Sequence, residues 1–240
     1  MTRLSVNINK IATLRNARGG DSPNVVELAR DIQAFGAGGI TVHPRPDARH
    51  IRYQDVRDLR PVVHTEFNVE GNPTQRFMDL VLAVKPDQVT LVPDAPEAIT
   101  SHAGWDVVEH LSFLQQVVSE LKQQRIRTAI FLDPHPEYVA YAAQTGADRI
   151  ELYTEGYARG FANGQPDAAV KPYVETARLA YKQGLGVNAG HDLNSDNIGF
   201  LKEKIDFLAE VSIGHALISE ALYSGLARTV QSYLHKLSQS

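Results

Sequence analysis

Histidine and glutamate side chains recur in this sequence at the points where short apolar runs end. Four of the nine histidines stand at such points, and Glu70 stands at another, directly before a glycine. The four histidines are His43, His50, His191 and His215. Imidazole titrates near neutral pH and can exchange protons with a nearby carboxyl group, so this combination favours general acid–base catalysis. A single histidine at such a point would be explained more simply by hydrogen bonds to backbone groups. Four at equivalent points favour a shared site.

Two further sets of residues are suited to holding phosphate groups. Gly190-His191 and Gly214-His215 each place a glycine before a histidine, and the second pair opens a predicted helix, whose N–H groups can bind an anion. The other set is a group of arginines in the first quarter of the chain, for which solvated surface is the alternative. It consists of Arg15, Arg18, Arg45, Arg49 and Arg52.

Metal, thiol and Schiff-base chemistry are less favoured. The chain has no cysteine and no H-x-H or H-E-x-x-H spacing, and the only lysine at a strand end is Lys10. It also lacks the glycine-rich fingerprint of nicotinamide and flavin enzymes. We therefore expect neither a metal nor another cofactor, although inward carboxylates with strand-end histidines leave a metal site as an open alternative.

The charge and hydropathy of the chain exclude other partners. The net charge is −4, with 10 basic and 6 acidic side chains in residues 1–60 and 14 and 22 in residues 61–240. A mildly acidic chain of this kind is a poor match to nucleic acid. No apolar run approaches the roughly 18 residues that span a bilayer, and the N-terminus has no secretory apolar region. We expect a cytoplasmic protein with no nucleic-acid or membrane partner.

The elements that must position these residues alternate regularly along the chain. Short β-like runs are predicted at 4–9, 39–44, 64–70, 88–93, 127–133, 149–155, 184–190 and 209–214. Amphipathic helical stretches are predicted at 24–35, 107–124, 136–144, 170–183, 194–204 and 215–237, with Asp106 as the N-cap of the second. This pattern predicts an α/β fold, one (β/α)8 TIM barrel over residues 1–240, with a doubly wound sheet as the runner-up.

The faces of the predicted strands favour the barrel. The runs 4–9, 64–70 and 149–155 alternate apolar with polar residues, whereas buried strands of a doubly wound sheet read as continuous apolar runs. In a barrel the apolar side meets the helices and the polar side, which includes Glu66 and Glu151, lines the interior. Buried polar groups are costly unless they are paired, so we expect a hydrogen-bonded network inside the barrel.

The segment 155–167 is predicted to be a loop that closes over the barrel mouth. It contains glycines at 156, 160 and 164, and Tyr157 and Phe161 offer apolar cover for a water-sensitive intermediate. An ordinary flexible surface loop is the alternative interpretation.

Taken together, these residues resemble the pyridoxine 5′-phosphate synthase family of the deoxyxylulose phosphate-dependent route to vitamin B6. The motifs are V-N-I-N-K-I-A-T-L-R-N-A-R-G (6–19), G-I-T-V-H-P-R (39–45), L-V-P (91–93), V-N-A-G-H (187–191) and S-I-G-H-A (212–216). The resemblance spans the chain and implies a TIM barrel with additional helices and a homo-octamer. It also implies a transferase that condenses 3-amino-2-oxopropyl phosphate with 1-deoxy-D-xylulose 5-phosphate to give pyridoxine 5′-phosphate, phosphate and water.

The resemblance assigns roles to individual residues. His43, Glu70 and His191 match the acid–base groups. Positions around the amino-oxopropyl phosphate are matched by Asn7, Arg18, Asp192 through its backbone, Gly214 and His215, and those around the deoxyxylulose phosphate by Arg45, His50 and Thr100. The sequence departs from the commoner motifs at Asn9-Lys10, where the family has Asp-His, at Asp192, where it has glycine, and around Glu70.

Two other functions fit the same residues. A different phosphosugar enzyme on this barrel, an isomerase or an aldolase, would turn over a single substrate. A catalytically silent regulator would bind phosphorylated metabolites and release no phosphate. Phosphate release that needs both substrates separates the three functions.

Overall fold

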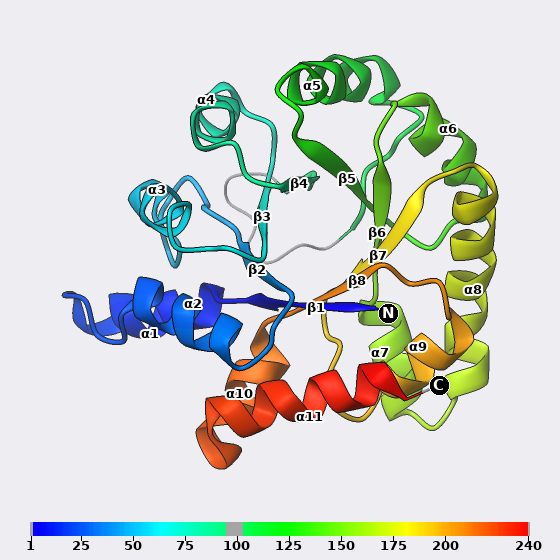
Figure 1. The fold of residues 1–240 in the computed structure, drawn as a ribbon. Helices are drawn as coiled ribbons and strands as arrows, with labels where there is room; N and C mark the ends of the chain where they lie inside the picture. The colour runs from blue at the N-terminus through cyan, green and yellow to red at the C-terminus, as the bar shows by residue number, and fades with distance from the viewer. Residues whose placement is uncertain (1, 95–102, 240) are drawn as a thin grey trace.

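The chain forms a closed barrel of parallel strands that follow one another in sequence order around the ring. The computed structural model describes residues 2–94 and 103–239, and within them β1 pairs with β2 and with β8 (Figure 1). The strands are β1 (Arg3–Asn7), β2 (Gly39–Val42), β3 (Glu66–Gly71), β4 (Gln88–Leu91), β5 (Arg127–Leu132), β6 (Arg149–Tyr153), β7 (Gly186–Gly190) and β8 (Glu210–Ile213). All eight predicted strands and the predicted (β/α)8 barrel are confirmed.

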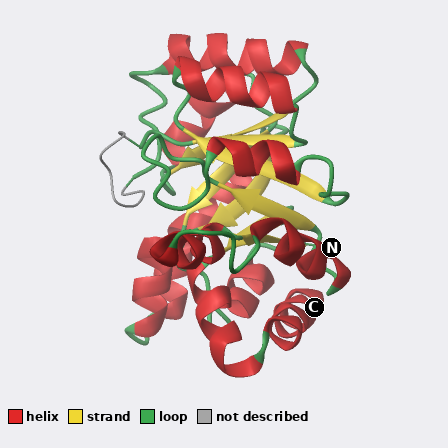
Figure 2. Cartoon of the chain, turned by 90° about the vertical axis from the view of Figure 1, so that its left-hand side faces the viewer, coloured by secondary structure: helices red, strands yellow, loops and turns green. Residues whose placement is uncertain are grey.

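Helices surround the barrel on its outside, as Figure 2 shows in a view across the strands. They are α1 (Asn9–Arg18), α2 (Val25–Ala34), α3 (Tyr53–Leu59), α4 (Gln75–Val84), α5 (Leu111–Gln123), a 3-10 turn (Pro136–Tyr138), α6 (Val139–Gln144), α7 (Glu155–Ala162), α8 (Pro166–Lys182), α9 (Ile198–Lys204), α10 (His215–Ser224) and α11 (Leu226–Ser238). Several strands are followed by two helices, so the barrel carries additional ones. No helix of the described residues is long and apolar enough to cross a membrane.

The apolar core lies between the strands and this layer of helices. Val6, Ile40 and Phe67 on the outer faces of the strands have no exposed surface. Helix α2 turns Ala29 and Ile32 towards them. Side-chain caps fix where such helices begin, because a cap satisfies an N–H group that has no partner within the helix. Asn24 accepts a hydrogen bond from the N–H of Glu27 at the start of α2, for example.

A chain of hydrogen bonds crosses the barrel interior, as the alternation of polar residues predicts. The Ser5 hydroxyl lies 2.7 Å from the Thr41 hydroxyl, which accepts from the Asn68 amide at 3.3 Å. The Thr90 hydroxyl lies 3.1 Å from both the Asn68 carbonyl oxygen and a Glu151 carboxyl oxygen. These side chains come from β1, β2, β3, β4 and β6 and are all buried. These side chains therefore pair from strand to neighbouring strand, and the Thr90–Glu151 contact links β4 to β6.

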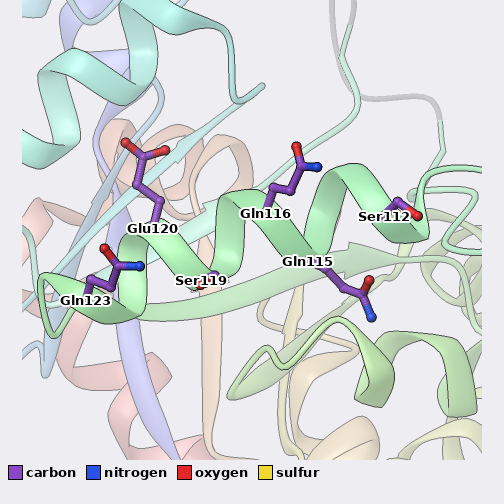
Figure 3. A pocket seen from close by; sticks show the side chains of 6 residues that line it. All are labelled: Ser112, Gln115, Gln116, Ser119, Glu120 and Gln123. Carbon is purple, nitrogen blue, oxygen red and sulfur yellow. The ribbon is translucent and has the colours of Figure 1, made fainter.

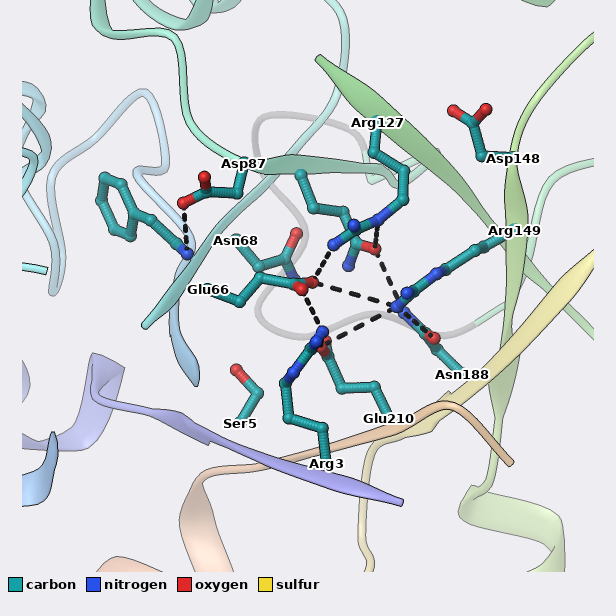
Figure 4. A network of polar contacts seen from close by, with 12 residues as sticks. Arg3, Ser5, Glu66, Asn68, Asp87, Arg127, Asp148, Arg149, Asn188 and Glu210 are labelled. Atoms are coloured by element: carbon teal, nitrogen blue, oxygen red, sulfur yellow. Dashed lines mark hydrogen bonds and ion pairs between the residues drawn. The ribbon is translucent and has the colours of Figure 1, made fainter. Parts of the chain in front are cut away.

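The first residues of the strands form a charged cluster that fills the N-terminal end of the barrel (Figure 4). We call these five residues the floor cluster: Arg3, Glu66, Arg127, Arg149 and Glu210. Arg3 and Arg127 each form an ion pair with Glu66, and Arg3 lies 3.2 Å from Glu210. Arg149 lies 3.9 Å from both carboxylates. The floor cluster joins β1, β3, β5, β6 and β8, and its two carboxylates are almost completely buried.

Helix boundaries differ from the predictions in several places, and three of them are instructive. Asp106 accepts hydrogen bonds from the N–H groups of Val108 and Glu109, but these belong to a turn, and α5 begins only at Leu111. The stretch 194–204 is helical only from Ile198. The stretch 215–237 is two helices, because Gly225 between them has a left-handed backbone, with φ of 81°.

The prediction of a loop at 155–167 is wrong for most of that segment. Residues Glu155–Ala162 form helix α7, and its Tyr157 is fully buried, with its hydroxyl donating to the Asn197 carbonyl oxygen at 2.6 Å. Gly160 lies against α8, where a Cβ would come within 2.5 Å of the Ala169 Cβ. The glycine thus allows two helices to pack closely, and the aromatic side chain anchors the segment in the core.

Candidate active site

The C-terminal ends of β1, β2 and β3 bring three of the predicted site residues together. The Asn7 amide lies 3.4 Å from Glu70 Oε2, and His43 Nδ1 lies 3.8 Å from the same oxygen. The Asn9 carboxamide oxygen accepts from the His43 N–H at 2.9 Å, which ties the end of β1 to the end of β2. Asn9 therefore has a structural role in this chain, fixing the backbone from which the His43 imidazole projects.

Burial shifts the pKa values of His43 and Glu70 in opposite directions. Loss of water around the His43 ring, and then the positive charge of Arg45, lower its pKa well below the usual value. Loss of water around the Glu70 carboxyl, and then the negative charges of Glu151 and Asp94, raise its pKa well above the usual value. The lowered pKa favours the neutral imidazole and the raised pKa favours the protonated carboxyl, so the first is suited to accept a proton and the second to donate one.

Glu151 is a third ionisable group of the mouth, which the sequence placed inside the barrel but not in the site. Burial raises its pKa to about 7, while the hydrogen bond from Thr90 and the charge of His191 oppose that rise. A Cβ on Gly190 would come within 2.5 Å of its Oε1, so a side chain at position 190 would displace the Glu151 carboxyl group. The charge of Glu151 contributes to the raised pKa of Glu70, and the charge of His191 acts on Glu151. The sequence signal that could have identified Glu151 is its place on the inward, polar side of the sixth predicted strand.

Arg45 is the buried cation of the mouth. Its guanidinium lies 2.6 Å from the Asp94 carboxylate, and both side chains are 5% exposed. His50 stands beside this pair, with its ring centroid 6.2 Å from that of His43. Burial, followed by the charges of Arg45 and Lys10, lowers the pKa of His50 to about 4. Asp94 follows β4, at a strand end where the sequence places residues of the mouth, but its pairing with Arg45 was not predicted.

The other arginines of the predicted anion-binding group have partners or positions of their own, and Arg49 adds its charge to that of Arg45 at His43 and His50. Arg15 is buried and makes two hydrogen bonds to the Asp55 carboxylate, at 2.7 and 2.8 Å, so it connects α1 to α3. Arg49 pairs with Asp47, and Arg52 donates to an Asn16 side chain. Arg18 is exposed at the end of α1, and no hydrogen bond or ion pair joins it to another described residue. Its contact with phosphate stays a prediction.

The remaining predicted residues follow β7 and β8. His191 and Asp192 come directly after β7, and the His191 ring packs edge-on against Tyr153 with centroids 4.9 Å apart. Gly214 is the N-cap of α10 and His215 is its first residue, exposed to solvent. A Cβ on Gly214 would come within 3.1 Å of the Asn7 Cβ, so this glycine also brings the ends of β8 and β1 close together. Thr100 lies outside the described residues.

A hollow on the outer surface is distant from these groups. It runs along the solvent side of α5 between Ser112 and Gln123, and its side chains are mainly hydroxyls and carboxamides, as Figure 3 shows. Its lining residues include no acid–base pair, so we do not assign a catalytic role to it. Within the described ranges no three histidine, aspartate or glutamate side chains are arranged to hold a metal ion, and the absence of a metal stays a prediction.

Solved structures share the fold at low sequence identity. A thiamine phosphate pyrophosphorylase from Pyrococcus furiosus superposes with a TM-score of 0.63 at 13% identity, covering 98% of this chain and 95% of that one. A phosphoribosylanthranilate isomerase from Thermotoga maritima gives 0.61 at 12% identity, with full coverage of both chains. These similarities establish the barrel and leave the reaction undetermined.

The sequence itself is similar to a family of biosynthetic enzymes. The family model "Pyridoxal phosphate biosynthesis protein PdxJ" matches residues 4–239. The pyridoxine 5′-phosphate synthase of Christiangramia forsetii is 63% identical over 99% of this chain and 100% of its own length. That of Bacteroides thetaiotaomicron is 60% identical, over 97% of this chain and 98% of its own length. With these matches along its whole length, the chain belongs to the pyridoxine 5′-phosphate synthase family of enzymes.

Proposed function

We propose that the enzyme condenses 3-amino-2-oxopropyl phosphate with 1-deoxy-D-xylulose 5-phosphate, releasing pyridoxine 5′-phosphate, inorganic phosphate and water. The observation that carries the proposal is the pair His43 and Glu70, 3.8 Å apart, with pKa values moved in opposite directions. A neutral base beside a protonated acid can move protons in both directions near neutral pH. The relatives to which the chain is similar are named for the synthesis of pyridoxine 5′-phosphate, the product of this reaction.

The reaction needs several proton transfers and no covalent bond to the enzyme. The amine of one substrate and the ketone of the other form an imine between them. Loss of water and phosphate, ring closure and aromatisation then move protons at carbon and oxygen. His43 and Glu70 serve one side of the mouth and His191 the other, while Glu151, with a pKa of about 7, lies beneath and acts on both sides. All of these steps are within the range of general acid–base catalysis.

Two phosphorylated substrates require two anion sites. Arg45, with His50 and Thr100, holds the deoxyxylulose phosphate. Because Arg45 is paired with Asp94, the phosphate exchanges one charge-assisted contact for another on a guanidinium that is already oriented. The amino-oxopropyl phosphate lies across the mouth, at the start of α10 and the turn after β7. Its contacts are Asn7, Arg18, the backbone of Asp192, Gly214 and His215.

The substrate requirement tests the reaction. The enzyme is incubated with each substrate alone and with both, and phosphate and pyridoxine 5′-phosphate are measured by colorimetry and mass spectrometry. We expect both products only when both substrates are present. Turnover of one substrate alone would indicate an isomerase or aldolase, and binding without any product would indicate a regulator. Either result overturns the proposal.

Two alanine variants test the separation of the anion sites. A charge-assisted hydrogen bond to phosphate is worth about 1.5–3 kcal/mol, or roughly a 10- to 150-fold change in affinity. Arg45→Ala should raise the KM of deoxyxylulose phosphate, and Arg18→Ala that of the amino-oxopropyl phosphate. Equal effects of both variants on both substrates would refute separate sites. The homo-octamer that the resemblance implies is a separate expectation, which the sedimentation velocity of the same preparations tests.

A further inference from the structure

The turn that carries His191 is built from two consecutive residues with left-handed backbone. His191 has φ of 83° and Asp192 has φ of 58°. This conformation costs an ordinary residue free energy that glycine does not lose. The buried Thr154 hydroxyl contacts the carbonyl oxygens of Gly190 and His191, and the Asn197 amide lies 3.4 Å from the Asp192 carbonyl oxygen. Surrounding contacts therefore hold the turn, and position 192 retains a side chain where glycine would be unstrained.

The Asp192 side chain is directed at the neighbouring imidazole. Its Oδ2 lies 3.0 Å from His191 Nδ1. The hydrogen bond from His191 holds the pKa of Asp192 below its usual value, so the carboxylate is ionised at neutral pH. An ionised carboxylate can only accept a hydrogen bond, which makes Nδ1 of His191 the donor. Tyr153 packs edge-on against the same ring, so contacts on two sides fix its orientation.

We propose that Asp192 is a positioning residue for His191. The carboxylate keeps the proton of the neutral ring on Nδ1, leaves the lone pair on Nε2, and stabilises the ring when it takes up a second proton. This inference rests on the proposed role of His191 in proton transfer. It gives the side chain of residue 192 a function distinct from the backbone contact to substrate, and a glycine at this position could not supply it.

Two substitutions separate this role from a structural one. Asp192→Gly suits the left-handed backbone and should fold with an unchanged or higher Tm, yet kcat should fall by about 10-fold with little change in KM, since one charge-assisted contact is lost. Asp192→Asn also tolerates this backbone, but its amide can donate to Nδ1 and move the ring proton to Nε2. We therefore expect Asp192→Asn to lose more activity than Asp192→Gly, although it is the more conservative change.

The tautomer of the ring gives a readout that does not depend on turnover. Nitrogen NMR of ¹⁵N-histidine-labelled, ligand-free enzyme, assigned with His191→Gln, should show His191 protonated on Nδ1. Asp192→Asn should show it protonated on Nε2. The matched control is Asp196→Asn, which removes an exposed carboxylate from the same loop and makes no contact with His191 among the described residues. It should leave both the tautomer and kcat unchanged.

The outcomes distinguish this inference from the proposed reaction. Wild-type His191 protonated on Nε2, or an Asp192→Gly variant with wild-type kcat, would overturn the role of Asp192 while synthase activity persists. A His191→Gln variant as active as the wild type would remove the role of His191 and the proposal with it. If the wild type makes no pyridoxine 5′-phosphate, the proposed function fails, and the tautomers of the wild type and Asp192→Asn still decide whether the carboxylate sets the state of the ring.

Discussion

Glu66 and Glu70 stand on the same face of β3, at opposite ends of the barrel interior, and their carboxyl groups behave in opposite ways. Burial disfavours the charge of Glu66, but hydrogen bonds from Arg127 and Glu210 and the charges of Arg127 and Arg3 outweigh it and lower the pKa. At Glu70 burial is reinforced by Glu151 and Asp94, and the pKa rises well above its usual value. One strand thus carries a stable anion at its start and a proton donor near its end.

The difference shows how a barrel separates stability from chemistry. In the floor cluster each carboxyl group lies beside arginines of opposite charge, and these contacts hold five strands together. At the mouth the carboxyls of Glu70 and Glu151 interact with each other and are not surrounded by arginines in this way. Their pKa values are therefore raised, which favours the protonated forms. Groups that change protonation near neutral pH are the ones a proton-transfer reaction needs.

Replacing Glu70 by glutamine should have the largest effect, and on activity alone. Glutamine matches the shape of the protonated carboxyl but cannot release a proton. We expect turnover to fall by roughly 10²–10⁴-fold, the usual contribution of general acid–base catalysis, with a nearly unchanged Tm. His43→Asn should behave in the same way. Product formation and thermal unfolding are measured on the same preparations, and unfolding without a specific loss of turnover would defeat this interpretation.

The same substitution at Glu66 should give the reverse result. Glu66→Gln leaves Arg3 and Arg127 without their buried carboxylate, and breaking such a pair costs about 3–5 kcal/mol of stability. Urea unfolding should show this loss, while the folded variant retains kcat within a few-fold of wild type. A Glu66→Gln variant that unfolds like the wild type would mean that the floor cluster does not stabilise the barrel.

Glu210→Gln should have the smallest effect at neutral pH but should change the pH dependence of stability. Burial, followed by the charge of Glu66, raises the pKa of Glu210 to about 8, whereas its ordinary value is 4.5. Between these values the folded protein holds a proton that the unfolded chain has released, so this residue lowers stability as pH rises. Glutamine cannot titrate. The stability of Glu210→Gln relative to wild type should therefore improve from about pH 5 to pH 8, and parallel pH profiles of the two proteins would contradict the raised pKa of Glu210.

The alternation of apolar and polar residues along the strands allowed the fold to be predicted from the sequence, because it showed which side of each strand faces the helices. The same pattern placed Glu66 and Glu151 inside. It could not show that 155–162 is helical, because the two glycines there, with a third at 164, favour a loop by intrinsic propensity. Tertiary packing of Tyr157 and the close approach of α7 to α8 at Gly160 override that propensity, and neither contact is visible in a local pattern.

The site was predictable where a residue stands at a strand end and less so where a partner comes from elsewhere. The structure brings His43, Glu70 and Asn7 together as expected. Arg15 was grouped with Arg45 because each follows the end of one of the first two strands, but Arg15 pairs with Asp55 of α3 and Arg45 pairs with Asp94. Which carboxylate meets which arginine depends on long-range geometry that composition and spacing do not encode.

The floor cluster has a consequence for how the chain is synthesised. Arg3 reaches Glu210 across 207 positions of the chain, from the first strand to the last. Proteins leave the ribosome N-terminus first, so this contact cannot form until β8 has emerged. Until then Arg3 lacks this partner, and a charge that water reaches carries little desolvation cost. The floor cluster is therefore completed only when the last strand is in place.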